Sequence, residues 1–339
     1  MYDNAKWEYD MLLNEISQTK LALGSDVSLT IVTDMDINDV NKLFDQLWEK
    51  VFIFERRFSR FLPMSELSLF NRSTGLNTPI TSEFKDLLVN AKRLGSETEG
   101  LYNPFILPAL QKTGYIKSAA SGYQNDSQID YTNRRVVDID RLVIEDNSAQ
   151  IPYGTAIDLG GCGKGYLADQ LGQILQNKSV QGYWLSLGGD IVTMGYDKLG
   201  QPINLNIQDA NDLSSTTNWI IGCPIEHFAV ATSGTFKRIG QDNKKDWHHI
   251  IDPLTQKPAE TDIRLATVCA DTAIKADVLA SCAVILGSKV AIRFLKAQGV
   301  KSAILQCVDE NGVFFEKVFG KNIKENKLYS NRVRTFQNA

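Results

Sequence analysis

An aspartate and a serine lie four residues apart in an otherwise apolar segment, Ala276-Asp277-Val278-Leu279-Ala280-Ser281. Residues four apart on a helix project from the same face, so the Asp277 carboxylate and the Ser281 hydroxyl would lie side by side. A carboxylate in an apolar helix is costly unless it is paired or bound to a metal. Both groups are hard oxygen ligands, which suit Mg²⁺ rather than zinc or copper. The pair predicts a magnesium site; the alternative is an aspartate that only caps a neighbouring turn.

A glycine-rich loop runs directly into a helical pattern at Asp158-Leu159-Gly160-Gly161-Cys162-Gly163-Lys164-Gly165-Tyr166. Glycines let backbone N–H groups approach a phosphate, and a helix N-terminus favours an anion. Lys164 adds a positive charge. The loop fails the P-loop pattern twice, because Asp158 and Gly165 stand where Gly and Ser/Thr are needed, and no βαβ unit follows as in dinucleotide-binding folds. It indicates a phosphate contact, or a strand-to-helix turn that serves packing alone.

Two further segments could approach a ligand. In Ser186-Leu187-Gly188-Gly189-Asp190-Ile191 a glycine pair interrupts a strand, which indicates close approach of a ligand or, alternatively, a bulge or corner. In Ala229-Val230-Ala231-Thr232-Ser233-Gly234-Thr235 hydroxyl groups gather at a strand end. They suit contact with a phosphate or a ribose, and taken alone they also fit a capped turn.

Two of the three histidines of the chain are neighbours, in His248-His249-Ile250-Ile251-Asp252-Pro253. Neighbours on a strand point to opposite faces, so only one of the two can face a site. A histidine beside Asp-Pro and after a polar loop is a candidate for acid–base chemistry, although a lone histidine is more often structural.

The elements that would position these groups can be read from periodicity. Apolar steps of three and four from Ile37 to Phe58 predict a long amphipathic helix. A second helix is expected with Ser82 as its N-cap, and others over about 164–177 and about 273–299, the last broken at Gly287. Strands are expected at 27–32, 141–145, 183–187, 203–207, 219–223, 228–231, 266–270 and 303–308. This order is not a regular βαβ alternation, so it predicts an α+β fold with antiparallel sheets.

The composition is that of an ordinary globular protein, with 43% hydrophobic and 22% charged residues over 339 positions. The net charge of −4 and the lack of a long basic run argue against nucleic-acid binding. The five cysteines are scattered and form no CxxC pair, so neither a disulfide framework nor a zinc site is indicated. No stretch approaches the ~20 apolar residues of a membrane span. The N-terminus shows no leader or lipobox cysteine, so a cytoplasmic protein is expected; an exported lipoprotein whose leader has been removed would look the same.

Taken together and in this order, the segments resemble the ApbE family of FAD:protein FMN transferases. The resemblance runs from about residue 20 to about residue 318. It rests on FSRFLPMSELSLFN, GLYNPF, DLGGCGKGYLAD, SLGGDI, AVATSG, HHIIDPLTQKPA and ADVLASCAVILG. It implies one catalytic unit over 20–320, two-lobed and related to the T-fold, with FAD in the cleft between the lobes. Residues 1–19 would be a helical N-terminal extension and 321–339 a C-terminal tail.

The resemblance also implies roles for single residues. The expected metal ligands are Gly161, through its backbone oxygen, Asp277 and Ser281, and His249 is the expected catalytic residue. The expected FAD contacts are Leu23, Phe61, Asp158, Lys164, Thr232, Ser233, Gly234 and Ala259. The chain departs from the family pattern at Ser281, where Thr is usual, at Asn103, often Asp, and at Cys162, commonly apolar. None of these changes removes a ligand type that the chemistry requires.

The implied reaction is Mg²⁺-dependent transfer of FMN from FAD to a Thr or Ser of an acceptor flavoprotein that carries a flavinylation motif, with release of AMP. Two alternatives remain open from the sequence. One is a Mg²⁺-dependent pyrophosphatase that uses water in the same site and yields FMN and AMP. The other is a flavin-binding protein without turnover, for which an intact metal pair would have no evident use.

Overall fold

The structure is a computed structural model that describes residues 13–118, 129–236, 238–242 and 245–325. Its centre is an eight-stranded sheet with the order β1-β2-β6-β7-β10-β15-β16-β17, in which every neighbouring pair is antiparallel. The strands are β1 (Asn14–Ala22), β2 (Ser25–Thr33), β6 (Gly182–Leu187), β7 (Asp190–Gly195), β10 (Phe228–Gly234), β15 (Ile263–Ala270), β16 (Ser302–Val308) and β17 (Phe314–Phe319). The α+β prediction with antiparallel sheets is confirmed.

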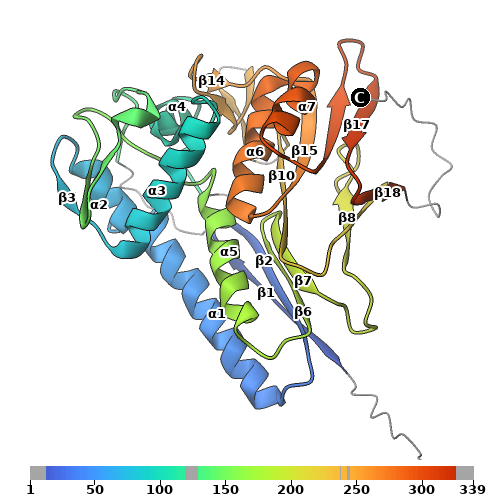
Figure 1. The fold of residues 1–339 in the computed structure, drawn as a ribbon. Coiled ribbons are helices and arrows are strands. Elements are labelled where there is room, and N and C mark those ends of the chain that lie inside the picture. The colour runs from blue at the N-terminus through green and yellow to red at the C-terminus, as the bar shows by residue number, and fades with distance from the viewer. Residues whose placement is uncertain (1–12, 119–128, 237, 243–244, 326–339) are drawn as a thin grey trace, which may run out of the picture.

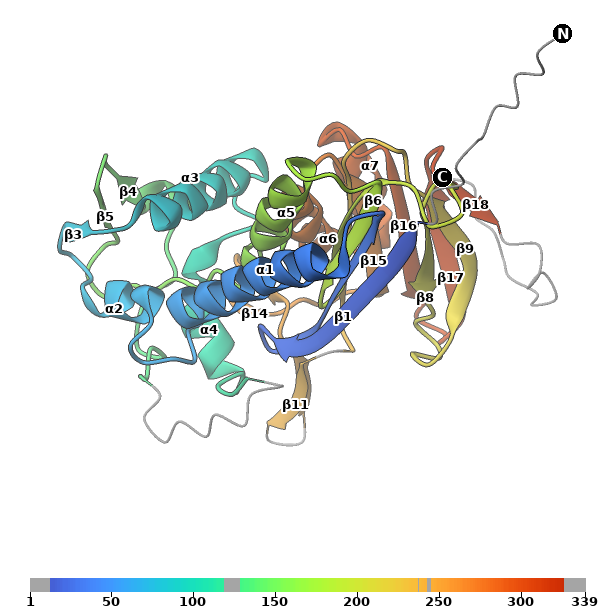
Figure 2. The ribbon, with the colours of Figure 1, turned by 90° about the horizontal axis from the view of Figure 1, so that it is seen from below.

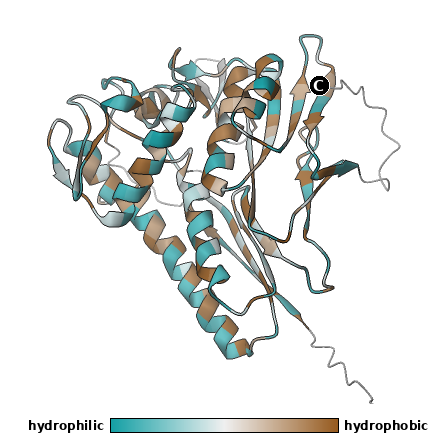
Figure 3. Cartoon of the chain, viewed as in Figure 1, coloured by the Kyte–Doolittle hydropathy of each residue, from teal (hydrophilic) through white to brown (hydrophobic). Residues whose placement is uncertain are grey.

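Helices α5 (Gly163–Gln176), α6 (Ala273–Leu286) and α7 (Ser288–Ala297) lie along one face of this sheet (Figure 1). Helix α6 packs against β10, β15 and α5 together, which explains why it is apolar on nearly all sides, whereas α1 is striped (Figure 3). The predicted break at Gly287 is confirmed, because that residue adopts φ +70° between α6 and α7. A methyl group at Gly165 would lie 2.5 Å from the Ala273 carbonyl oxygen, so α5 and α6 approach closely where they cross.

The opposite face of the sheet is covered by a small sheet of β8 (Asn204–Gln208), β9 (Thr216–Gly222) and β18 (Ile323–Glu325). Its apolar residues form one cluster with residues of β10, β15 and β16. Strand β16 is consequently buried along both faces, and it reads as a nearly continuous apolar run.

Two short hairpins, β11 (Ile239–Asp242) with β12 (Lys245–His248) and β13 (Ile251–Asp252) with β14 (Lys257–Pro258), lie between β10 and β15 in the chain. The elements between β2 and α5 form the other lobe, with α1 (Ile37–Phe58) running beneath both lobes (Figure 2). The periodic apolar residues of α1 are buried as predicted. The lobe contains α2 (Glu66–Arg72), β3 (Thr78–Pro79), α3 (Ser82–Glu97), a 3₁₀ turn (Pro104–Ile106), α4 (Leu107–Lys112), a second 3₁₀ turn (Ile139–Arg141), β4 (Val143–Ile144) and β5 (Ser148–Gln150). The N-cap of α3 is Thr81 rather than Ser82, since the Phe84 backbone N–H donates to the Thr81 hydroxyl at 3.2 Å.

Two predicted segment boundaries are wrong. The expected helical extension over 1–19 includes residues 14–19 of β1, while residues 1–12 lie outside the described part of the chain. Strand β1 pairs along its length with β2, and Trp48 of α1 donates to Gln18 at 2.7 Å. The expected tail over 321–339 begins inside the fold, because β18 pairs with β9; residues 326–339 lie outside the described part. Both errors arise because the stabilising partner is a strand or helix elsewhere in the chain.

Within the described ranges, no helix has the length and apolar character that crossing a bilayer requires.

Candidate active site

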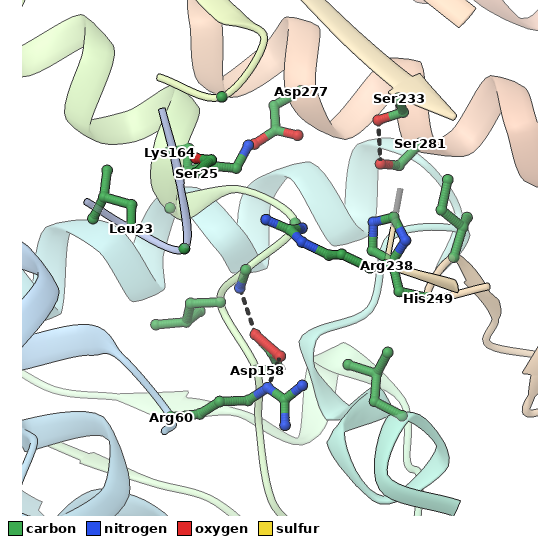
Figure 4. A pocket seen from close by; sticks show the side chains of 18 of the residues that line it. Leu23, Ser25, Arg60, Asp158, Lys164, Ser233, Arg238, His249, Asp277 and Ser281 are labelled. Atoms are coloured by element: carbon green, nitrogen blue, oxygen red, sulfur yellow. Dashed lines mark hydrogen bonds and ion pairs between the residues drawn. The ribbon is translucent and has the colours of Figure 1, made fainter. Parts of the chain in front are cut away.

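A cavity of about 770 Å³ lies where the two lobes meet. Its walls come from the β1–β2 turn, the end of α1, the glycine loop before α5, the β6–β7 turn, the end of β10, the segment after β12 (Lys245–His248) and α6. Figure 4 shows the charged and hydroxyl side chains that converge on it. Segments that are far apart in the sequence therefore meet in one site.

Asp277 lies at the α6 wall and is only 4% exposed. Burial, followed by the nearby Asp190, raises the pKa of this carboxyl to about 8, although Lys164 and the Gly165 backbone N–H act in the opposite direction. Its Oδ2 atom is buried and has no hydrogen-bond partner among the described residues. The hydrogen bond from the Gly165 backbone N–H fits the alternative in which Asp277 caps a neighbouring turn. That bond nevertheless leaves the Oδ2 atom of Asp277 without a partner. A buried carboxylate with such an oxygen fits a cation.

The two other predicted metal ligands, Ser281 and the Gly161 carbonyl, are neutral oxygen groups. The Ser281 hydroxyl shares a hydrogen bond of 2.9 Å with the Ser233 hydroxyl, and Gly161 lines the same cavity. No group of three or more His, Cys, Asp and Glu side chains in the described ranges is placed to hold a metal. Because the nearby Asp190 carboxylate is paired with Lys164, a cation here would draw on the Asp277 carboxylate with hydroxyl and carbonyl oxygens. That donor set fits Mg²⁺, which binds through few carboxylates and keeps several waters.

Lys164 lines the cavity, but its ammonium group forms an ion pair with Asp190, which is 2% exposed. Burial lowers the pKa of Lys164, and the carboxylates of Asp190 and Asp277 raise it more, so the net shift is upward. Lys164 thus stays charged, and much of its charge is balanced by Asp190. The expected contact between Lys164 and FAD remains a prediction. Because of the ion pair with Asp190, Lys164 would attract a phosphate less strongly than an unpaired lysine would.

Asp158 is held by Arg60, whose Nε lies 2.9 Å from the Asp158 Oδ2 atom. Asp158 also accepts from the Gly160 backbone N–H at 2.5 Å, which fixes the start of the glycine loop. The Arg60 guanidinium stacks on Phe61 and Tyr115, at 4.2 and 4.6 Å from the ring centroids. These rings line the cavity and form an aromatic wall, suited to a planar ligand.

Leu23 stands in the tight β1–β2 turn with φ +55°, a conformation that is uncommon for a residue other than glycine. Its backbone N–H donates to the Glu55 Oε1 atom at 3.0 Å, which ties the turn to α1. Both residues line the cavity. The turn is thus positioned from the helix side as well as by the sheet.

The two neighbouring histidines lie in different environments, as predicted. His249 lines the cavity and contacts the Tyr115 ring, with 6.0 Å between the ring centroids. His248 does not line it; its Nε2 atom lies 3.1 Å from the Ala259 carbonyl oxygen. The catalytic role of His249 stays a prediction. The expectation that Ala259 lies against the ligand is not supported, because Ala259 is buried beside His248 and outside the cavity wall.

The other predicted segments also reach the cavity. Thr232, Ser233 and Gly234 line it at the end of β10, although the Thr232 hydroxyl is already hydrogen-bonded to Thr267 at 2.9 Å. Gly188 and Gly189 form the two-residue turn between β6 and β7, with φ +70° and +110°. The corner interpretation of this glycine pair is therefore correct, and the turn also lines the cavity.

Sequence reasoning missed four residues of the site. Arg60, Asp190 and Tyr115 hold other groups in place, and Arg238 extends into the cavity. Arg60 and Asp190 lie inside segments that carry the resemblance, and their charges could have marked them as site residues. Arg238 and Tyr115 lie in polar stretches without periodicity, and only the fold brings them to the site.

The sequence of this chain matches the model of the ApbE family over residues 23–305. The chain belongs to the ApbE family. The FAD:protein FMN transferase of Haemophilus influenzae is 26% identical over 279 residues, covering 80% of both chains. The enzyme of the same name from Salmonella typhimurium is 27% identical over 243 residues, covering 70% of this chain and 69% of the relative.

Solved structures with this fold include the flavinyl transferase ApbE of Pseudomonas stutzeri in its apo form. Its TM-score is 0.75 at 19% identity, covering 90% of this chain and 95% of that chain. The flavin transferase ApbE of Vibrio cholerae gives a TM-score of 0.73 at 22% identity, covering 90% and 97%. These likenesses establish the ApbE fold for this chain.

Proposed function

We propose that this protein transfers FMN from FAD to a Thr or Ser hydroxyl of an acceptor protein and releases AMP. The observation that carries the proposal is the buried Asp277 carboxylate, whose Oδ2 atom has no partner in the described chain, at a cavity with an aromatic wall. A cation site beside a cavity for a planar ligand suits a substrate that joins aromatic rings through a pyrophosphate. Membership of the family and the names of the relatives support the same assignment.

The residues that would hold Mg²⁺ are Asp277, Ser281 and the Gly161 carbonyl. When bound, Mg²⁺ would supply positive charge to the pyrophosphate, which otherwise repels a nucleophile. Phe61 and Tyr115 would hold a ring of FAD against the aromatic wall. The glycine loop would place backbone N–H groups near the phosphates.

In the proposed step, the acceptor hydroxyl oxygen forms a bond to the phosphorus of the FMN half. The bond from that phosphorus to the bridging oxygen breaks, and AMP leaves with the bridging oxygen. His249 would accept the hydroxyl proton and later lose it to solvent. General-base assistance of this kind contributes roughly 10²–10⁴-fold, so positioning and charge neutralisation must supply the rest.

The test is to incubate the full chain with FAD and Mg²⁺, with and without a candidate acceptor, and to measure AMP by chromatography. Release of AMP that requires the acceptor supports transfer. Release without any acceptor would instead identify a pyrophosphatase. FAD binding without AMP in either condition, across the acceptors tried, would identify a flavin-binding protein.

A further inference from the structure

The charged side chains that line the cavity do not favour an anion. Four are acidic and three are basic: Asp26, Glu55, Asp158, Asp277, Arg60, Lys164 and Arg238. Two of the three basic side chains already form ion pairs with a carboxylate, Lys164 with Asp190 and Arg60 with Asp158. A ligand with a pyrophosphate needs a cation that is not already neutralised, in addition to a metal.

Arg238 is that cation. It is half-buried, and it forms neither a hydrogen bond nor an ion pair with any residue that the structure describes. In Figure 4 its side chain crosses the cavity from the side of His249 and ends between the Lys164–Asp277 group and the Asp158–Arg60 pair. Its charge is close enough to lower the pKa of both Asp277 and Lys164.

The backbone of Arg238 has an uncommon conformation. Its φ of +53° lies in the left-handed region, which L residues other than glycine seldom adopt. The residue stands at the junction between β10 and β11 (Ile239–Asp242), where the chain leaves the large sheet to form the β11–β12 hairpin. Such conformations persist where the surroundings impose them, and they are frequent at ligand sites.

We propose that Arg238 binds the pyrophosphate of the nucleotide substrate directly and is the main protein cation that does so. A guanidinium is always charged and offers paired donors that match two phosphate oxygens. Lys164, held by Asp190, would then act chiefly as a structural partner within the site. This inference rests on the proposed function only for naming FAD as the ligand. That the ligand carries a pyrophosphate is tested separately, with ADP.

The test compares Arg238→Gln, Arg238→Lys and the wild type for equilibrium binding of three probes in the presence of Mg²⁺. The probes are FAD, ADP, which carries a pyrophosphate without flavin, and riboflavin, which carries flavin without phosphate. Arg293→Gln, on the exposed surface of α7 and outside the cavity, removes the same charge and is the matched control. Thermal melting checks that each variant is folded.

We expect Arg238→Gln to weaken binding of FAD and of ADP by about 10- to 100-fold, the usual effect of losing hydrogen bonds to a charged group. Riboflavin affinity should stay within about twofold, Arg238→Lys should be intermediate, and Arg293→Gln should match the wild type. Unchanged FAD and ADP affinities in a folded Arg238→Gln variant would overturn the inference. An equal loss for riboflavin would also overturn it, because the role would then be structural.

Failure of the proposed function gives a different pattern. If ADP binding depends on Arg238 but the protein releases no AMP from FAD with any acceptor, the phosphate site stands and the transferase assignment falls. If the wild type binds neither FAD nor ADP, both proposals fail.

Discussion

Replacing Asp277 by asparagine should stabilise the metal-free protein, although it removes a proposed metal ligand. The amide copies the shape of the protonated acid but cannot ionise. Burial and the neighbouring Asp190 raise the pKa of Asp277 from 3.8 to about 8. Between these two values the unfolded chain releases the proton while the folded chain retains it, so the wild type loses stability as pH rises. The asparagine variant does not carry this penalty.

The size of the effect follows from the shift. Each pH unit within the window costs about 1.4 kcal/mol, so at pH 7 the penalty is about 4 kcal/mol. At about 2 °C per kcal/mol for a chain of this size, the variant should melt about 8 °C above the wild type at pH 7. The difference should be close to zero near pH 4 and should stop growing above about pH 8.

The assay is thermal unfolding of both proteins in EDTA at a series of pH values, repeated with added Mg²⁺. Magnesium at about 100 times its Kd should stabilise the wild type by about 2.7 kcal/mol and leave the variant unchanged. A variant that melts at or below the wild-type temperature in EDTA at pH 7 would refute the argument that Asp277 is an uncompensated buried carboxyl. Equal stabilisation of both proteins by Mg²⁺ would refute its role as a ligand.

Three further predictions concern other parts of the site. His249→Ala should lower the transfer rate by roughly 10²-fold with FAD binding little changed, while the rate of His248→Ala should stay within a few-fold of the wild type. Equal losses of rate in the two variants would contradict the assignment of His249 as the base. Ser281→Thr should keep nearly full AMP release and Ser281→Ala should reduce it moderately, since water can replace one neutral ligand; total loss in the alanine variant would show that the hydroxyl has another role. Gly165→Ala should destabilise the fold by about 3 kcal/mol in denaturant unfolding, because the new methyl would lie 2.5 Å from the first turn of α6. The control Gly222→Ala, whose methyl has its nearest contact at 3.6 Å, should leave the stability nearly unchanged.

The elements that sequence reasoning placed well are those with strong local periodicity. Helix α1 begins and ends where its apolar spacing begins and ends, and the α6–α7 break follows from one glycine. The spacing of Asp277 and Ser281 needed only helix geometry, and both side chains line the cavity. Such features depend on neighbours in the sequence, so the sequence alone predicts them.

The features that sequence reasoning missed depend on partners that are distant in the chain. Strand β1 is only partly buried and is recognisable as a strand chiefly through its pairing with β2. The Lys164–Asp190 ion pair joins two motifs that lie 26 residues apart in the chain. Neither motif alone indicates that Lys164 is paired rather than free to bind a phosphate. Arg238 follows the end of β10, and its position depends on a left-handed backbone conformation that no residue pattern in the sequence predicts.

The central claim is most directly tested by the intact mass of an acceptor protein after incubation with this chain, FAD and Mg²⁺. Candidate acceptors should include a variant in which the target Thr or Ser is replaced by alanine, and Asp277→Ala should serve as the inactive enzyme. The account predicts that the acceptor gains the mass of one FMN on that hydroxyl, with one AMP released, and that both controls remain unmodified. An acceptor that stays unmodified while FAD is cleaved to free FMN and AMP would contradict it.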